Sequence, residues 1–83
     1  PSIRLLIVDD HAVYRRTLRR ICEAKFGFTV VGEAANGRDA VELARTLSPD
    51  VILMDVEMPV MDGVEATRRI MAADPQARVI ILT

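Results

Sequence analysis

Three carboxylates follow two continuous apolar runs of this sequence. Asp9 and Asp10 come directly after residues 5–8, and Asp55 comes directly after residues 51–54. Carboxylates that meet at the ends of buried strands repel one another unless a cation lies between them. Oxygen ligands suit a hard divalent ion such as Mg²⁺, and the sequence has no cluster of histidines or thiols that would favour a softer metal. The spacing therefore predicts an acidic pocket that holds Mg²⁺.

The elements that must position these carboxylates alternate along the chain in the order β-α-β-α-β-α-β. Apolar runs predict strands at residues 3–8, 29–34, 51–54 and 79–82. Stretches of helical period predict helices at residues 12–25, 38–47 and 63–73, with turn signals between the elements. The side chains expected to face the core are Tyr14, Leu18, Ile21 and Cys22 in the first helix, Ala40, Leu43, Ala44 and Leu47 in the second, and Val64, Thr67, Ile70 and Met71 in the third.

Strands that alternate with helices imply right-handed crossovers and a parallel sheet covered on both faces, an α/β fold. All strands of such a sheet end at the same edge, and ligands bind in the crevice beyond that edge. Asp9, Asp10, Asp55 and Thr83 are all expected there. Taken singly, either member of the first pair could cap the following helix, and Asp55 could open a loop. Four polar groups from three strands at one edge favour a binding site.

Length and charge limit the classes of function. The chain has 83 residues, enough for one small domain, and its net charge of −1 makes no electrostatic case for nucleic acid or an anionic membrane. The single cysteine, Cys22, excludes an intramolecular disulfide. With no signal peptide and no apolar run of membrane-spanning length, the sequence favours a cytoplasmic protein that does not enter the membrane.

These residues resemble the receiver domain of bacterial two-component response regulators. The resemblance spans the whole chain and is carried by residues 5–10, 49–55, 58–63 and 79–83. It implies a flavodoxin-like parallel sheet of strand order 2-1-3-4. The start Asp9-Asp10-His11 and the stretch 31–37 are similar to the subgroup with a LuxR-type helix-turn-helix output, so the expected output is transcription.

The resemblance also implies roles for individual residues. Asp55 would be the phosphoacceptor, taking a phosphoryl group from a phosphohistidine of a histidine kinase. Asp10 would bind Mg²⁺ directly and Asp9 through water, with the backbone carbonyl of Glu57 as a further ligand. The Thr83 hydroxyl would contact a phosphoryl oxygen. The chain is then expected to be a signalling receiver and not an enzyme, apart from its own phosphorylation and dephosphorylation.

Four arginines of the first helix, Arg15, Arg16, Arg19 and Arg20, are expected on its outward side. Such a run is usually a solvated face. In receivers this helix meets the kinase, so the resemblance implies docking there. His11 is expected to be an exposed first-turn residue without a catalytic role. Pro59 and Gly63 are typical of a shaped loop after the acceptor.

The chain departs from the family pattern after residue 83. Receivers have five strands, so we expect residues 1–83 to be a C-terminally incomplete receiver domain without its last helix-strand-helix and without an output domain. The missing part would carry a lysine that closes over the phosphoryl group. The strand Val79–Leu82 would then be an apolar edge, which favours a homodimer, an exchanged segment or a longer chain that covers it. DNA would be bound only through the absent output domain.

Two other classes of function fit parts of the sequence. An acidic pocket suits a Mg²⁺-dependent phosphohydrolase with an aspartyl nucleophile, but Glu57 stands where such enzymes carry an aspartate acid–base. An interaction module would keep the fold without phosphorylation and use the edge strand and the arginines for partners.

Overall fold

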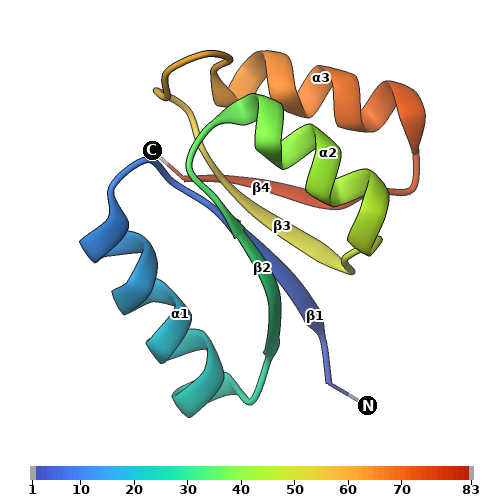
Figure 1. The fold of residues 1–83 in the computed structure, drawn as a ribbon. Helices are drawn as coiled ribbons and strands as arrows, with labels where there is room; N and C mark the ends of the chain where they lie inside the picture. Colours follow the sequence, from blue (N-terminus) through green and yellow to red (C-terminus); the bar gives the residue numbers. More distant parts are fainter. Residues whose placement is uncertain (1, 83) are drawn as a thin grey trace.

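Four parallel strands form one sheet in the computed structural model, which describes residues 2–82 (Figure 1). The strand order is β2-β1-β3-β4, as predicted. The strands are β1 (Arg4–Val8), β2 (Thr29–Ala34), β3 (Val51–Asp55) and β4 (Val79–Leu82). The helices are α1 (Ala12–Phe26), α2 (Gly37–Leu47) and α3 (Gly63–Ala73). The predicted elements are all present, with ends that shift by one residue; the shift that matters brings Asp55 into the end of β3.

The central strand β1 is buried on both faces, because helices cover both sides of it. Its residues 5–8 are at most 1% exposed. Leu6 and Val8 face the core under α2 and α3, whereas Leu5 and Ile7 face the core under α1. Successive side chains of a strand point to opposite faces, so a continuous apolar run is what a strand between two helical layers requires.

The face of the sheet that carries α1 is only partly covered. Of the predicted inward stripe, Cys22 is buried and Leu18 half-buried, but Tyr14 and Ile21 are 54% and 43% exposed, so that part of the prediction is wrong. The reason is that α1 packs beside β1 and β2 and leaves the β3–β4 side of this face open (Figure 1). Ile80, which pairs with Leu53 in register, is 52% exposed there.

The two helices on the other face pack against each other as well as on the sheet. In α2 the predicted inward set is confirmed, with Ala40 fully buried. In α3 the prediction is partly wrong. Ala66 and Ile70 are buried, whereas Val64 and Met71 are exposed. The buried residues of α3, Ala66 and Ile70, face α2 and share an apolar cluster with the small side chain of Ala40.

The loops at the carboxyl edge of the sheet are held by helix caps. Asn36 accepts a hydrogen bond from the Asp39 N–H at the start of α2, and Asp62 accepts one from the Glu65 N–H at the start of α3, each at 2.8 Å. Side-chain caps of this kind satisfy amides that have no partner within the helix. Each helix within residues 2–82 falls short of the length and hydropathy that a membrane crossing requires.

Candidate metal centre

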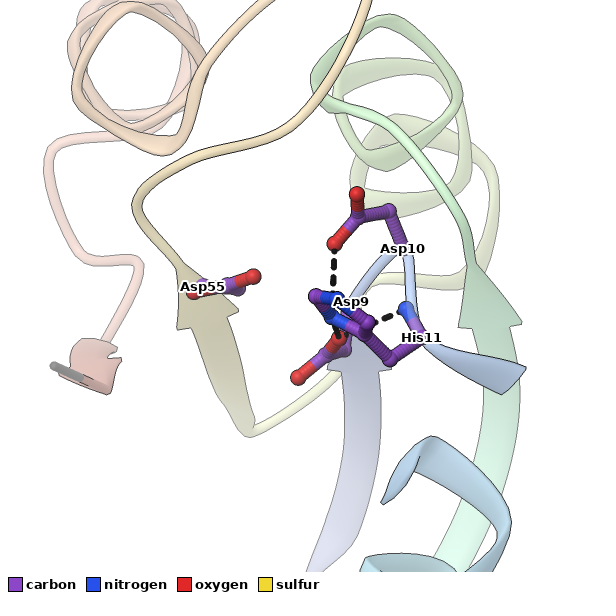
Figure 2. Close-up of side chains that lie close together, drawn as sticks. All are labelled: Asp9, Asp10, His11 and Asp55. Carbon is purple, nitrogen blue, oxygen red and sulfur yellow. Dashed lines mark hydrogen bonds and ion pairs between the residues drawn. The ribbon is translucent and has the colours of Figure 1, made fainter. Parts of the chain in front are cut away.

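The ends of β1 and β3 bring three carboxylates together. Asp9 and Asp10 directly follow β1, and Asp55 is the last residue of β3. Ligand atoms of these three residues and of His11 all lie within 4.8 Å of one another. Figure 2 shows the Asp55 carboxylate directed toward the others from the neighbouring strand. The predicted gathering of acidic groups at this edge is therefore present in the structure.

Asp9 is fixed at three atoms and is only 4% exposed. Its N–H donates to the Ala34 carbonyl at 3.0 Å, which continues the β1–β2 pairing. Its carbonyl accepts from Arg15 Nη1 at 2.6 Å, and its Oδ1 accepts from the His11 N–H at 2.8 Å. The N-cap of α1 is His11, which makes no side-chain cap bond. The alternative that Asp9 or Asp10 caps the helix is therefore wrong.

Asp55 is half-buried, and the Val56 N–H donates to its Oδ1 at 2.8 Å. The pKa of its carboxyl group is raised above the ordinary value, chiefly because burial disfavours the charged form. The negative charges of Asp9 and Asp10 raise it further. A cation among these groups would favour their charged forms, so the electrostatics of the site fit a divalent ion.

His11 lies over the acid pair, and its side chain is 75% exposed, as predicted. Its Nδ1 is 3.2 Å from Asp9 Oδ1 and 3.1 Å from Asp10 Oδ1 (Figure 2). The histidine pKa is raised, first by the hydrogen bond with Asp9 and then by the charge of Asp10. This contact was not predicted, and its only signal in the sequence is that the three residues are adjacent.

An open depression of about 600 Å³ lies over the carboxylates. It is lined by Asp10, His11, Asp55, Val56, Glu57 and Leu82. The depression gives a small anion or a partner side chain direct access to Asp55. Thr83, the remaining predicted site residue, lies outside the described residues, directly after Leu82. The ligand roles of Asp9, Asp10, Asp55 and the Glu57 carbonyl stay predictions, although oxygen donors around an open space suit Mg²⁺.

The loop after Asp55 is built around close backbone contacts. Gly63 donates its N–H to the Val56 carbonyl at 2.7 Å, and a Cβ at this glycine would lie 1.9 Å from the Asp55 carbonyl oxygen. Val60 has a φ of 70°, which is strained for a β-branched residue. The Met61 N–H bonds to the Pro59 carbonyl across it, at 2.7 Å. The prediction of a shaped loop is confirmed. The positive φ of Val60, in contrast, is not indicated by the sequence.

The four arginines of α1 do not share one outward face, so this part of the prediction is wrong. The Arg15 side chain is only 18% exposed, and its Nε donates to Glu33 Oε1 on β2 at 2.9 Å. Arg19 donates to the other oxygen of Glu33 at 2.7 Å. Arg16 and Arg20 are exposed. The acidic partner on β2 turns two of the arginines toward the sheet.

The family model described as the response regulator receiver domain matches residues 5–83. Among curated proteins, the protein-glutamate methylesterase/protein-glutamine glutaminase of Alkalilimnicola ehrlichii is 55% identical over 74 residues, which are 89% of this chain and 19% of that protein. The protein of the same name from Vibrio parahaemolyticus is 51% identical over 74 residues, 89% of this chain and 20% of its own length. The chain thus spans about a fifth of the curated relatives it matches.

Solved structures give the same fold. A LuxR-family two-component response regulator from Aurantimonas has a TM-score of 0.92 and 41% identity, covering 98% of this chain and 58% of that one. The response regulator domain of Thermotoga maritima CheB has a TM-score of 0.92 and 46% identity, covering 98% and 60%. A chain of the CheX–CheY–BeF3–Mg²⁺ complex from Borrelia burgdorferi has a TM-score of 0.91 and 34% identity, covering 95% of this chain and 60% of that one.

The comparisons correct one expectation. The chain was expected to be a signalling receiver and not an enzyme, but the curated relatives carry the name of an enzyme, a methylesterase and glutaminase. The match lies within one part of those proteins, at 19–20% of their length. Sequence patterns within residues 1–83 report on the matched part alone, which is why they did not indicate an enzyme.

Proposed function

The chain belongs to the response regulator receiver domain family, and on this premise we propose that Asp55 accepts a phosphoryl group from a phosphohistidine of a partner kinase. The observation that carries the proposal is the position of Asp55 within 4.8 Å of Asp9, Asp10 and His11, below an open depression. A receiver of this kind reports a signal by the presence or absence of the phosphoryl group, and an attached output responds to it.

The transfer needs a nucleophile in line with the bond that breaks. A carboxylate oxygen of Asp55 attacks phosphorus, the P–N bond of the phosphohistidine breaks, and the imidazole nitrogen keeps the electron pair and takes up a proton. The Val56 N–H holds Asp55 Oδ1 at 2.8 Å, which limits rotation of the carboxylate before the attack. The product is a mixed anhydride. Water hydrolyses it, so the signal is reversible.

The residues expected to hold Mg²⁺ are Asp9, Asp10 and Asp55 with the backbone carbonyl of Glu57. When bound, the ion offsets negative charge on the phosphoryl oxygens. This proposal is supported by the oxygen-rich donor set and by the raised pKa of Asp55, which burial raises most and the negative charges of Asp9 and Asp10 raise further. The Borrelia CheX–CheY complex contains both BeF3 and Mg²⁺, which supports the same pairing in this chain.

Docking of the kinase on α1 remains part of the proposal in a narrower form. Arg16 and Arg20 are exposed on α1 and are the arginines best placed to meet a partner. Arg15 and Arg19 are engaged with Glu33. Exchange of the two exposed arginines for glutamate should slow transfer from the kinase and leave phosphorylation by acetyl phosphate intact. Equal loss of both reactions would contradict docking at this face.

A homodimer or an exchanged segment through β4 also remains a proposal. It is supported by the exposure of Ile80 and Ile81, at 52% and 40%, on a strand at the edge of the described sheet. Light scattering over a range of concentrations tests it. A mass that stays at one chain throughout would contradict it.

Two outputs are proposed for the protein that contains the receiver. The expected transcriptional output is supported by the LuxR-family neighbour at 41% identity. A protein-glutamate methylesterase output is favoured by the higher identity to those relatives, 55% over the matched region. Assays of the intact protein for methyl-ester hydrolysis and for DNA binding separate the two. The cytoplasmic location stays a prediction.

Beryllofluoride, a stable mimic of the phosphoryl group, tests the receiver proposal against its alternatives. A receiver binds Mg²⁺ and beryllofluoride together at Asp55, and an Asp55→Asn variant does not. A scaffold without phosphorylation binds neither, and a phosphohydrolase turns over a small phosphate ester. Joint binding lost in Asp55→Asn supports the proposal, whereas absence of binding in the wild type would refute it.

A further inference from the structure

We propose that Arg15 is a positioning residue for the metal centre, in that it fixes the Asp9–Asp10 peptide from the side of β2. The inference rests on the proposed function and adds a residue that touches neither metal nor phosphoryl group. It is carried by one hydrogen bond, from Arg15 Nη1 to the Asp9 carbonyl oxygen at 2.6 Å.

Arg15 is itself held firmly. Its Nε donates to Glu33 Oε1 at 2.9 Å, while Arg19 donates to Glu33 Oε2 at 2.7 Å. Glu33 lies on β2 opposite Ile7 of β1, next to the end of the central strand. The pKa of Glu33 is lowered by Arg19 and Arg15, so the carboxylate is kept charged by both guanidinium groups. These hydrogen bonds therefore connect β2, through Glu33 and Arg15, to the Asp9 carbonyl after the end of β1.

The geometry explains why a bond to a backbone oxygen affects a side chain. The peptide unit is planar, so fixing the Asp9 carbonyl also fixes the plane that carries the nitrogen and Cα of Asp10. The N–H of Asp9 is already bound to the Ala34 carbonyl at 3.0 Å. With Arg15 on the next carbonyl, both peptide groups at the strand end are held. Asp10, with a side chain 29% exposed, then points into the site without a fixed bond of its own to β2.

A positioning role and a purely electrostatic role of Arg15 predict opposite effects of its removal on the affinity for Mg²⁺. If Arg15 acted only through its positive charge, its removal would reduce repulsion of the cation, and Mg²⁺ would bind more tightly. If it acts by holding the peptide, its removal leaves Asp10 free to turn away, and Mg²⁺ binds more weakly. Groups that orient metal ligands from behind typically change metal affinity by about tenfold to a hundredfold.

The test is the Mg²⁺ dissociation constant of the intact protein, followed by the amide signals of the site residues in an NMR titration. Arg15→Gln should raise the dissociation constant at least about tenfold relative to wild type. Arg19→Gln is the matched control, because it removes the same charge and one contact to Glu33 but leaves the bond to Asp9. It should stay within about twofold of wild type, since distant charges are screened.

Two further measurements separate positioning from loss of fold. The carbonyl carbon shift of Asp9 reports its hydrogen bond directly and should move in Arg15→Gln and stay in Arg19→Gln. Arg15→Lys keeps the charge but has one ammonium group for two partners, so its dissociation constant should lie between those of wild type and Arg15→Gln. This variant tests the proposal even where Arg15→Gln does not fold.

The outcomes are distinguishable from failure of the proposed function. If wild type does not bind Mg²⁺, the metal centre itself is refuted, and this inference with it. If wild type binds Mg²⁺ but Arg15→Gln and Arg15→Lys bind it as tightly or more tightly, only the role of Arg15 is overturned. Weaker binding in both variants, with Arg19→Gln near wild type, supports the positioning role.

Discussion

Replacement of Asp55 by asparagine should stabilise the metal-free protein, although it removes the acceptor. The reason is that Asp9, Asp10 and Asp55 place three carboxylates together. Asparagine has nearly the same shape, and it can still accept the Val56 N–H with its side-chain oxygen. The substitution therefore removes one negative charge and leaves the packing of β3 in place.

The magnitude follows from the separation of the groups. At 4.8 Å, the limit within which their ligand atoms lie, two unit charges repel by about 3.5 kcal/mol at an effective dielectric constant of about 20, and by about 0.9 kcal/mol in bulk water. Asp9 is buried but the Asp10 side chain is 29% exposed, and His11 offsets part of the charge. We expect a net gain of about 1–3 kcal/mol in the free energy of unfolding.

Urea unfolding in a metal-free buffer with a chelator measures this gain as a higher midpoint at unchanged slope. Glu42→Gln is the matched control, because it removes a carboxylate that is 63% exposed and paired with Arg45 on the surface. It should change stability by less than about 1 kcal/mol. An Asp55→Asn protein that is no more stable than wild type would refute the repulsion, and with it the electrostatic argument for a cation site.

Mg²⁺ should reduce the stability difference between the two proteins, since a hundredfold excess over its dissociation constant stabilises wild type by about 2.7 kcal/mol and the Asp55→Asn variant by less. The metal-free wild type should lose stability as pH rises through the raised pKa of Asp55, because the folded state holds that proton more tightly than the unfolded state. The stability of the Asp55→Asn variant should lack this dependence on pH. Gly63→Ala should destabilise by about 1–3 kcal/mol or more in urea, because its Cβ would meet the Asp55 carbonyl oxygen at 1.9 Å. Asp62→Ala should cost about 1 kcal/mol in the same assay through loss of the α3 cap. The pKa of Glu33 is lowered by its two arginine partners, so its charged form should stabilise the fold above the unfolded-state pKa. That stabilisation should be lost as pH falls through the folded-state pKa, and Glu33→Gln should remove this pH dependence.

Much of the fold and the gathering of carboxylates could be predicted, because both depend on local rules. The continuous apolar runs 5–8 and 51–54, which alternate with helical segments, favour a parallel sheet between helices; residues 5–8 are buried on both faces, and in 51–54 Ile52 and Met54 are buried. Parallel strands end at one edge, so Asp10 and Asp55 had to come together once the strand order was right. These steps need only the periodicity of each segment and the handedness of crossovers.

The predictions are wrong at positions where contact with another helix or strand determines whether a side chain is buried. Tyr14 and Ile21 match the helical period of α1, yet they are exposed because that helix covers only part of its face of the sheet. Val64 is exposed because α3 is turned toward α2. The sequence predicts that Arg15 faces solvent, whereas its hydrogen bond to Glu33, eighteen residues away in the sequence, holds it against the sheet. Periodicity within one segment carries no information about these neighbours.

The measurement that tests the central claim most directly is mass spectrometry of the intact protein after incubation with acetyl phosphate and Mg²⁺, followed by peptide mapping. We expect one labile phosphoryl group, located on Asp55, whose appearance requires Mg²⁺ and is abolished in Asp55→Asn. A protein that stays unmodified, or that carries the group elsewhere with the same yield in the variant, would contradict Asp55 as the phosphoacceptor.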